Sequence, residues 1–342
     1  MQGNLNLLLY SQTKKITYSH SLNKSLIKIL KIAIPLGLGV FLIYYSYSKF
    51  SPQQLNEISF YFKKADYSIV GLSVFFSLLS HILRAYRWNF MLESLGYQPK
   101  IANNFMAVNV AYIMNLFIPK SGEISRAVII NKYEDVPFDK AFGTIISERA
   151  VDVVILFGFT AIALMLQFDL LFNFLTELIQ PSKLYIAFGA LGILIIIFFL
   201  FLKYSKSVLH QKLMQFYLGI KEGVLSILKM KKKGAYILHS LLIWGLYLLS
   251  FYTALHALEE TSGITFGIII ITFVVGSFSF AFTNSGFGTY PFFVAGILTV
   301  FSIPETVGTA FGWIVWTSSI ASIIFFGGLS LLILPFYNRD NN

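Results

Sequence analysis

The chain has 342 residues, of which 56% are hydrophobic and only 12% are charged, and it contains no cysteine. A soluble domain carries about 25% charged residues, so this composition predicts an all-α polytopic membrane protein. The lack of cysteine excludes disulfides, thiolate metal sites and a cysteine nucleophile. The five histidines are scattered without an HxxxH pair, so we expect neither a metal site nor a cofactor.

The N-terminal part predicts a basic arm followed by two membrane spans. Residues 1–31 contain five lysines and no acidic residue, which is typical of a cytoplasmic arm that contacts anionic membrane lipids. Apolar spans are predicted at 32–48 and 68–83. The second ends on the sequence RAYRW, an aromatic and basic edge that is typical of a headgroup boundary.

Two later apolar segments are interrupted by polar turns. The run at 101–118 contains four asparagines and stops at Pro119 and Gly122. A full span there would place the lysines and arginines that follow outside the cell, whereas a hairpin that enters from the cytoplasm and returns avoids this. The second hairpin has arms at 264–282 and 292–303 around the sequence TNSGFGTYP and enters from outside. The remaining predicted segments are spans at 141–168, 184–202, 235–257 and 306–336, with a basic linker at 203–234 and a tail at 337–342.

The expected fold is one membrane domain over 32–336, with about six full spans and two re-entrant hairpins, or about eight spans if the second hairpin crosses. With both termini in the cytoplasm, 22 of the 26 lysines and arginines lie inside, which follows the positive-inside rule and explains the net charge of +10 without nucleic acid. Interrupted hairpins of opposite orientation predict an inverted repeat with a site near the midplane. The alternative is that glycine and proline only kink ordinary helices.

The stretch 115–152 concentrates charge within apolar sequence, where a charged residue costs roughly 2.5–3.5 kcal/mol. If helical, Glu123 with Arg126 and Glu148 with Asp152 each share a face, and Arg126 and Arg149 could meet the three acids. Arginine binds phosphate through its planar fork, and carboxylates suit an amine or a sugar. The candidate headgroup-binding residues are Arg84, Arg87, Asn115, Lys120, Glu123, Arg126, Glu148, Arg149, Asp152, Asn284, Gly286 and Gly288.

Two alternatives apply to these residues. The charges could pair only with one another and fix the first hairpin against a neighbouring helix. Arg84 and Arg87 are better explained as anchors that extend to the headgroup layer than as ligands.

Three blocks carry a family resemblance: RAYRWNFMLESLG at 84–96, NLFIPKSGEISRA, and ERAVD at 148–152. In these the chain resembles the flippase-like family of the lysylphosphatidylglycerol synthase transmembrane domain, over about residues 25–335. The family usually has a glutamate near the second glycine-rich turn, where this chain has Thr289-Tyr290-Pro291. The resemblance implies a translocase without a synthase domain, in the bacterial inner membrane, that moves a phospholipid or a polyprenyl-linked lipid.

The alternative function is an integral-membrane enzyme or an assembly subunit in envelope lipid or glycan synthesis. Metal-dependent prenyl transfer uses clustered aspartates such as DDxxD, and the nearest match, from Asp135 to Asp139, is one residue too long and contains Pro137. The sequence contains no HExxH, GxSxG or Walker motif. These observations favour a transporter over an enzyme.

Overall fold

The computed structural model describes residues 33–169 and 230–339, together with positions 193, 214, 218 and 227. The predicted arm at 1–31, the span at 184–202 apart from position 193, and nearly all of the basic linker lie outside the described residues. In the part that is described, all regular secondary structure is α-helical. After a helix at 33–49, the helices are α2 (Pro52–Lys64), α3 (Tyr67–Ser94), α4 (Ile101–Phe117), α5 (Ser121–Glu134), α6 (Phe138–Leu166), α10 (Lys233–Leu255), α11 (Glu259–Ser262), α12 (Phe266–Phe282), α13 (Thr289–Val300) and α14 (Glu305–Tyr337).

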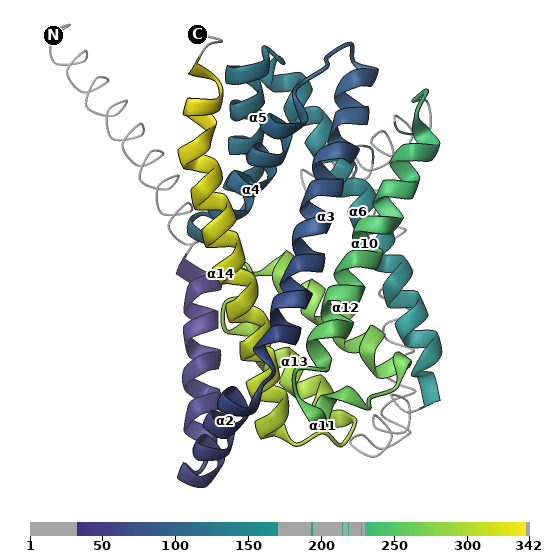
Figure 1. Cartoon of the computed structure of the whole chain (residues 1–342). Coiled ribbons are helices and arrows are strands. Elements are labelled where there is room, and N and C mark those ends of the chain that lie inside the picture. Colours follow the sequence, from purple (N-terminus) through teal and green to yellow (C-terminus); the bar gives the residue numbers. More distant parts are fainter. Residues whose placement is uncertain are drawn as a thin grey trace, which may run out of the picture.

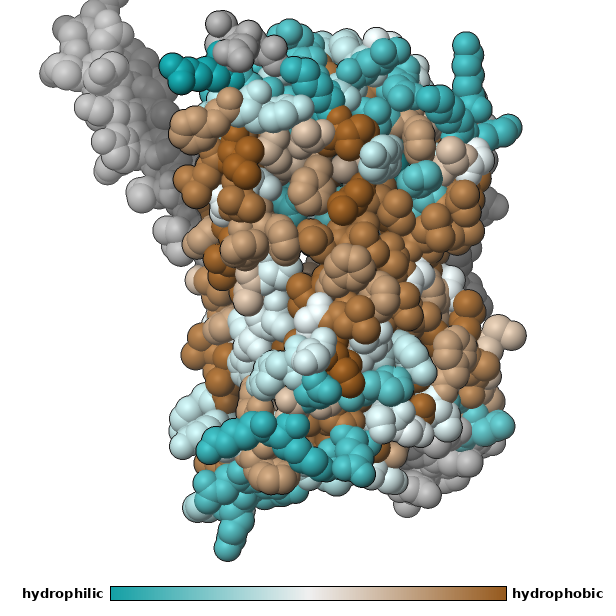
Figure 2. All heavy atoms as spheres, viewed as in Figure 1, coloured by the Kyte–Doolittle hydropathy of each residue, from teal (hydrophilic) through white to brown (hydrophobic). Residues whose placement is uncertain are grey.

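Four of the described helices, α3, α6, α10 and α14, are long and apolar enough to cross a membrane. They run along the height of the molecule in Figure 1. Hydrophilic residues gather at both ends of the molecule, and most hydrophobic residues lie in the belt between them (Figure 2). The predicted all-α polytopic membrane fold is confirmed.

Four shorter helices form the two interrupted hairpins, and three of them, α4, α12 and α13, are apolar. Helices α4 and α5 occupy the upper half of the view in Figure 1, and α12 and α13 occupy the lower half. Their turns meet, because the amide of Asn284 in the second turn donates a hydrogen bond of 2.8 Å to the carbonyl of Leu116 at the end of α4. The C-terminal end of α14 lies at the same end of the molecule as the first hairpin, and α2 lies at the opposite end. Which end faces the cytoplasm stays a prediction from the charge count.

The sequence of the first turn explains why α4 stops and the chain reverses. Lys120 adopts a left-handed backbone conformation with φ of 63°, and the side chain of Asn115 accepts a hydrogen bond of 2.7 Å from the backbone N–H of Gly122. A Cβ atom at Gly122 would lie 2.1 Å from the carbonyl oxygen of Ala111. Only glycine therefore allows α5 to approach α4 this closely.

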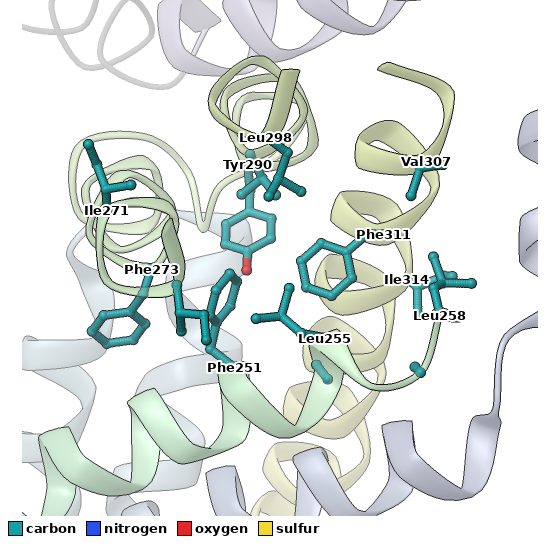
Figure 3. Close-up of a cluster of buried hydrophobic side chains, with 14 of the residues drawn as sticks. Phe251, Leu255, Leu258, Ile271, Phe273, Tyr290, Leu298, Val307, Phe311 and Ile314 are labelled. Carbon is teal, nitrogen blue, oxygen red and sulfur yellow. The ribbon is translucent and has the colours of Figure 1, made fainter. Parts of the chain in front are cut away.

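Two apolar cores hold the helices together. One core joins α10, α12, α13 and α14, where Phe251, Phe273, Tyr290 and Phe311 point toward one another (Figure 3). The other core lies around Trp88 and joins α3, α4, α5 and α6. Along α6, Ile145 belongs to the second core and Leu156 belongs to the first. The segment of α6 between them carries Glu148 and Asp152, so a charged layer separates the two cores.

The prediction that the second span ends at 83 is wrong. Helix α3 continues through Arg84 and Arg87 to Ser94, and both arginines are buried at 3% and 0% exposure. They are therefore not anchors at the headgroup layer. The helix continues because its later residues pack into the core around Trp88.

Candidate functional site

A buried charge cluster joins three helices in the layer between the two cores. We call it the arginine cluster, and it consists of Arg84 and Arg87 of α3, Arg126 of α5, and Glu148 and Asp152 of α6. Each helix supplies side chains from one face, because the two arginines of α3 are three residues apart and the two acids of α6 are four residues apart. The spacing in the sequence therefore builds the cluster as soon as the helices pack.

Glu148 lies at the centre of the cluster and is fully buried. Arg126 donates two hydrogen bonds to its two carboxylate oxygens, at 3.2 and 3.0 Å. Arg84 lies 2.5 Å from one of these oxygens, and Arg87 lies 3.0 Å from the same oxygen. One carboxylate therefore contacts three guanidinium groups.

Asp152 binds the two arginines of α3 from the other side. Its oxygens lie 3.0 Å from Arg84 and 2.8 Å from Arg87. The indole N–H of Trp244 also donates to Asp152 at 3.4 Å. Arg84 and Arg87 therefore each contact both carboxylates.

The arginine cluster has one positive charge more than it has negative charges. Three guanidinium groups face two carboxylates, and guanidinium stays protonated in proteins. In addition, the Nε atoms of Arg84, Arg87 and Arg126 are buried and donate no hydrogen bond within the described residues. A buried uncompensated charge is costly, so the geometry suits an anion that would supply a negative charge and accept these hydrogen bonds.

A partly exposed ion pair borders the arginine cluster. Arg149 lies 3.3 Å from Glu123 and 3.5 Å from Asp152. The side chains of Arg149 and Glu123 are 36% and 18% exposed, in contrast to the buried members. This neutral pair leaves the charge of the whole group unchanged and lies between the buried cluster and the protein surface.

Aromatic and hydroxyl groups surround the arginines. The ring of Trp88 lies 3.8 Å from the guanidinium carbon of Arg126, and the ring of Tyr236 lies 5.5 Å from that of Arg87. These contacts stabilise a cation away from water. Arg84 also donates to the hydroxyl of Tyr247 at 3.1 Å, and this hydroxyl lies 3.3 Å from that of Tyr112.

Helix α10 contributes residues to the site that were not predicted from the sequence. Ser240 accepts a hydrogen bond of 3.1 Å from Arg87, and Tyr236, Trp244 and Tyr247 also contact the arginine cluster. These four residues follow one another at spacings of four, four and three, which places them on one face of a helix. A polar and aromatic stripe along an otherwise apolar span was the signal that could have revealed them.

The structure divides the predicted site residues into two groups. Arg84, Arg87, Glu123, Arg126, Glu148, Arg149 and Asp152 come together as described, but the partner of Arg126 is Glu148 rather than Glu123. The others lie in the hairpin turns, where they hydrogen-bond backbone groups or adopt the backbone conformations that the turns require. Asn115 and Asn284 hydrogen-bond backbone groups, Lys120 is exposed at the start of α5, and Gly286 and Gly288 have φ of +73° and +67°.

The structure shows no group of three or more histidine or acidic side chains that could hold a metal ion within the described residues. The arginine cluster instead consists of three guanidinium groups that contact two carboxylates.

Residues 28–337 match the family described as the lysylphosphatidylglycerol synthase TM region. The chain belongs to this family. It is similar to a UPF0104 membrane protein of Methanocaldococcus jannaschii, with 26% identity over an alignment of 270 residues, and the match covers 70% of this chain and 77% of the relative. It is also 26% identical over 101 residues to the glycosyltransferase AglD of Haloferax volcanii, which covers 29% of this chain and 16% of that protein. No solved structure matches the chain.

Family membership and the long apolar helices identify a multi-pass membrane protein. The relative from Methanocaldococcus jannaschii is archaeal, so this similarity does not point to a bacterial membrane. The expectation of a bacterial inner membrane therefore stays a prediction.

Proposed function

We propose that this protein moves a lipid with a phosphate-bearing headgroup between the two leaflets of a cell membrane and binds the phosphate at the arginine cluster. The observation that carries the proposal is the uncompensated positive charge of the cluster, inside helices long enough to span a membrane. A phosphate supplies the missing negative charge and accepts hydrogen bonds from the free Nε groups.

The two hairpins support translocation rather than static binding. Their turns lie between the two halves of the molecule and contact each other through Asn284 and Leu116. Backbone that is not helical is tolerated at membrane depth where protein buries it or where it lines a cavity. Interrupted segments of opposite orientation are a general feature of transporters that bind their substrate near the midplane.

The arginine cluster recognises phosphate, and both a phospholipid and a polyprenyl phosphate carry this group. The partly exposed pair of Arg149 and Glu123 adds one charge of each sign beside the cluster. This pair would suit a headgroup that carries an amine or a sugar in addition to its phosphate. The chemistry thus defines a class of lipids, and the assay has to include both a phospholipid and a polyprenyl phosphate.

The similarity of 101 residues to a glycosyltransferase favours one alternative, a role within envelope glycan synthesis as an enzyme or an assembly subunit. A translocase moves lipid when it is the only protein in a vesicle. An assembly subunit does not, and an enzyme changes the chemical structure of the lipid. Measurement of lipid movement together with chemical analysis of the recovered lipid therefore separates the three possibilities.

The test uses the full chain reconstituted in liposomes with fluorescent phospholipids or a polyprenyl phosphate, and it measures which leaflet the lipid occupies over time. Arg126→Lys keeps the positive charge but removes the planar fork, so we expect lipid movement to fall at least tenfold while the melting temperature stays close to that of the wild type. Lys232→Gln is the matched control, because it removes a cation from an exposed ion pair with Glu93. The proposal is wrong if wild-type protein moves neither lipid, or if Arg126→Lys moves lipid as fast as the control.

A further inference from the structure

A cavity of about 460 Å³ lies on the opposite side of the molecule from the first hairpin, between the helix at 33–49 and helices α2, α13 and α14. No member of the arginine cluster lines it. Most of its wall is apolar, and its volume is within the range of ordinary small-molecule pockets, roughly 300–1,000 Å³. The apolar wall includes Phe50, Leu55, Ile58, Phe62, Phe292 and Trp313.

The cavity also has one positive and one negative residue in its lining. Lys49 is the last residue of the helix at 33–49, and Glu305 is the first residue of α14. Both are exposed, and both stand where an apolar helix meets a polar connection. Tyr47 and Trp313 line the same cavity, and tyrosine and tryptophan are enriched at the level of lipid headgroups.

This combination matches the two parts of a lipid. An acyl chain requires an apolar groove that is reached from the side of the protein, and Gly296 of α13 provides such an opening because it is exposed and lines the cavity. A headgroup requires charged partners at the end of the groove. We propose that this cavity binds a zwitterionic phospholipid, with an acyl chain along the apolar wall, the phosphate at Lys49 and the amine at Glu305.

The charges of Lys49 and Glu305 would also select one class of phospholipid headgroup over another. A phospholipid without an amine satisfies Lys49 and places its phosphate near the carboxylate of Glu305, which repels it. A zwitterionic headgroup satisfies both residues. The inference concerns binding alone and does not depend on translocation, so it can hold even if the arginine cluster proves to have another role.

Gly296 offers a way to block the opening of the cavity without disturbing the fold. A Cβ atom at Gly296 meets nothing within 4 Å, so Gly296→Leu places a side chain into open space beside the groove. Gly71 of α3 is the matched control, because it is also exposed, helical and free of neighbours within 4 Å. Both substitutions remove a helical glycine and therefore favour the helix to the same degree.

The experiment labels the purified full chain in detergent with phosphatidylethanolamine that carries a photoactivatable acyl chain, and mass spectrometry identifies the labelled peptides. We expect labelling within 43–62 and 291–296, at least fivefold more than with the same probe built on phosphatidylglycerol. Gly296→Leu should lose most of this labelling, and Gly71→Leu should keep it. Glu305→Lys should shift the preference toward phosphatidylglycerol.

Two results would overturn the inference. Labelling of these segments that is unchanged in Gly296→Leu would show that no acyl chain occupies the cavity. Equal labelling by the two probes in the wild type, with no change in Glu305→Lys, would show that Lys49 and Glu305 do not distinguish between the two headgroups. Size-exclusion chromatography confirms that each variant is folded, and Glu305→Lys changes only an exposed residue, so the second result can be obtained even if Gly296→Leu misfolds.

Discussion

The charge balance of the arginine cluster predicts that its members differ in what they contribute to stability. Glu148→Gln leaves three arginines with only Asp152, so two positive charges are uncompensated in a fully buried site. Breaking a buried ion pair by removing one partner costs roughly 3–5 kcal/mol. Arg126→Ala instead leaves two arginines and two carboxylates, and Glu148 keeps Arg84 and Arg87 at 2.5 and 3.0 Å. We expect this change to cost only about 1–3 kcal/mol, as an ordinary point substitution does.

Thermal unfolding of the detergent-solubilised chain tests this order. Glu148→Gln should have the lowest midpoint, and Arg126→Ala should lie between it and the wild type. The double variant should be more stable than Glu148→Gln alone, because it returns the cluster to a single uncompensated positive charge. Lys232→Ala controls for loss of an exposed ion pair, which is worth about 0–1 kcal/mol. Equal damage by the two single variants, without recovery in the double variant, would refute the reasoning from charge balance.

Two further outcomes are expected. Reporter fusions at Asn342 and within 169–183 should report opposite sides of the membrane because of the distribution of basic residues, and matching sides would contradict the topology. Gly122→Ala should destabilise the protein by about 1–3 kcal/mol, because its Cβ atom would lie 2.1 Å from the carbonyl of Ala111. Gly143→Ala is the control, since a Cβ atom there meets nothing within 4 Å, and equal melting temperatures for the two variants would show that the turn does not need glycine.

The hairpins could be predicted from the sequence because backbone chemistry is local. Pro119 and Gly122 favour a turn at this point of the chain, and the side chain of Asn115 can accept a hydrogen bond from a free backbone N–H group of such a turn. The charged residues of α6 could also be predicted as a site, since a helix of known period fixes which of them share a face. Neither inference requires knowledge of the neighbouring helices.

The pairings within the arginine cluster could not be predicted in this way. Arg126 pairs with Glu148 of another helix rather than with Glu123 on its own helix, and spacing along one helix says nothing of such contacts. The prediction that Arg84 and Arg87 are anchors at the headgroup layer failed for a related reason. An arginine at the end of an apolar run is an anchor if the helix stops there, and it becomes a buried member of an ion pair if the helix continues. The acids that pair with Arg84 and Arg87 are more than 60 residues away in the sequence.

The asparagines of the hairpins show why a polar residue at membrane depth is not always a ligand. A broken helix leaves backbone groups without partners, and no water is available in the bilayer core to satisfy them. Asn115 accepts from the N–H of Gly122, Asn284 donates to the carbonyl of Leu116, and Trp316 donates to the carbonyl of Ser285 at 2.9 Å. These contacts account for the polarity of the turns without a substrate. The arginine cluster differs, because its own partners leave a charge and several donors unsatisfied, and this deficit is what makes it the candidate site.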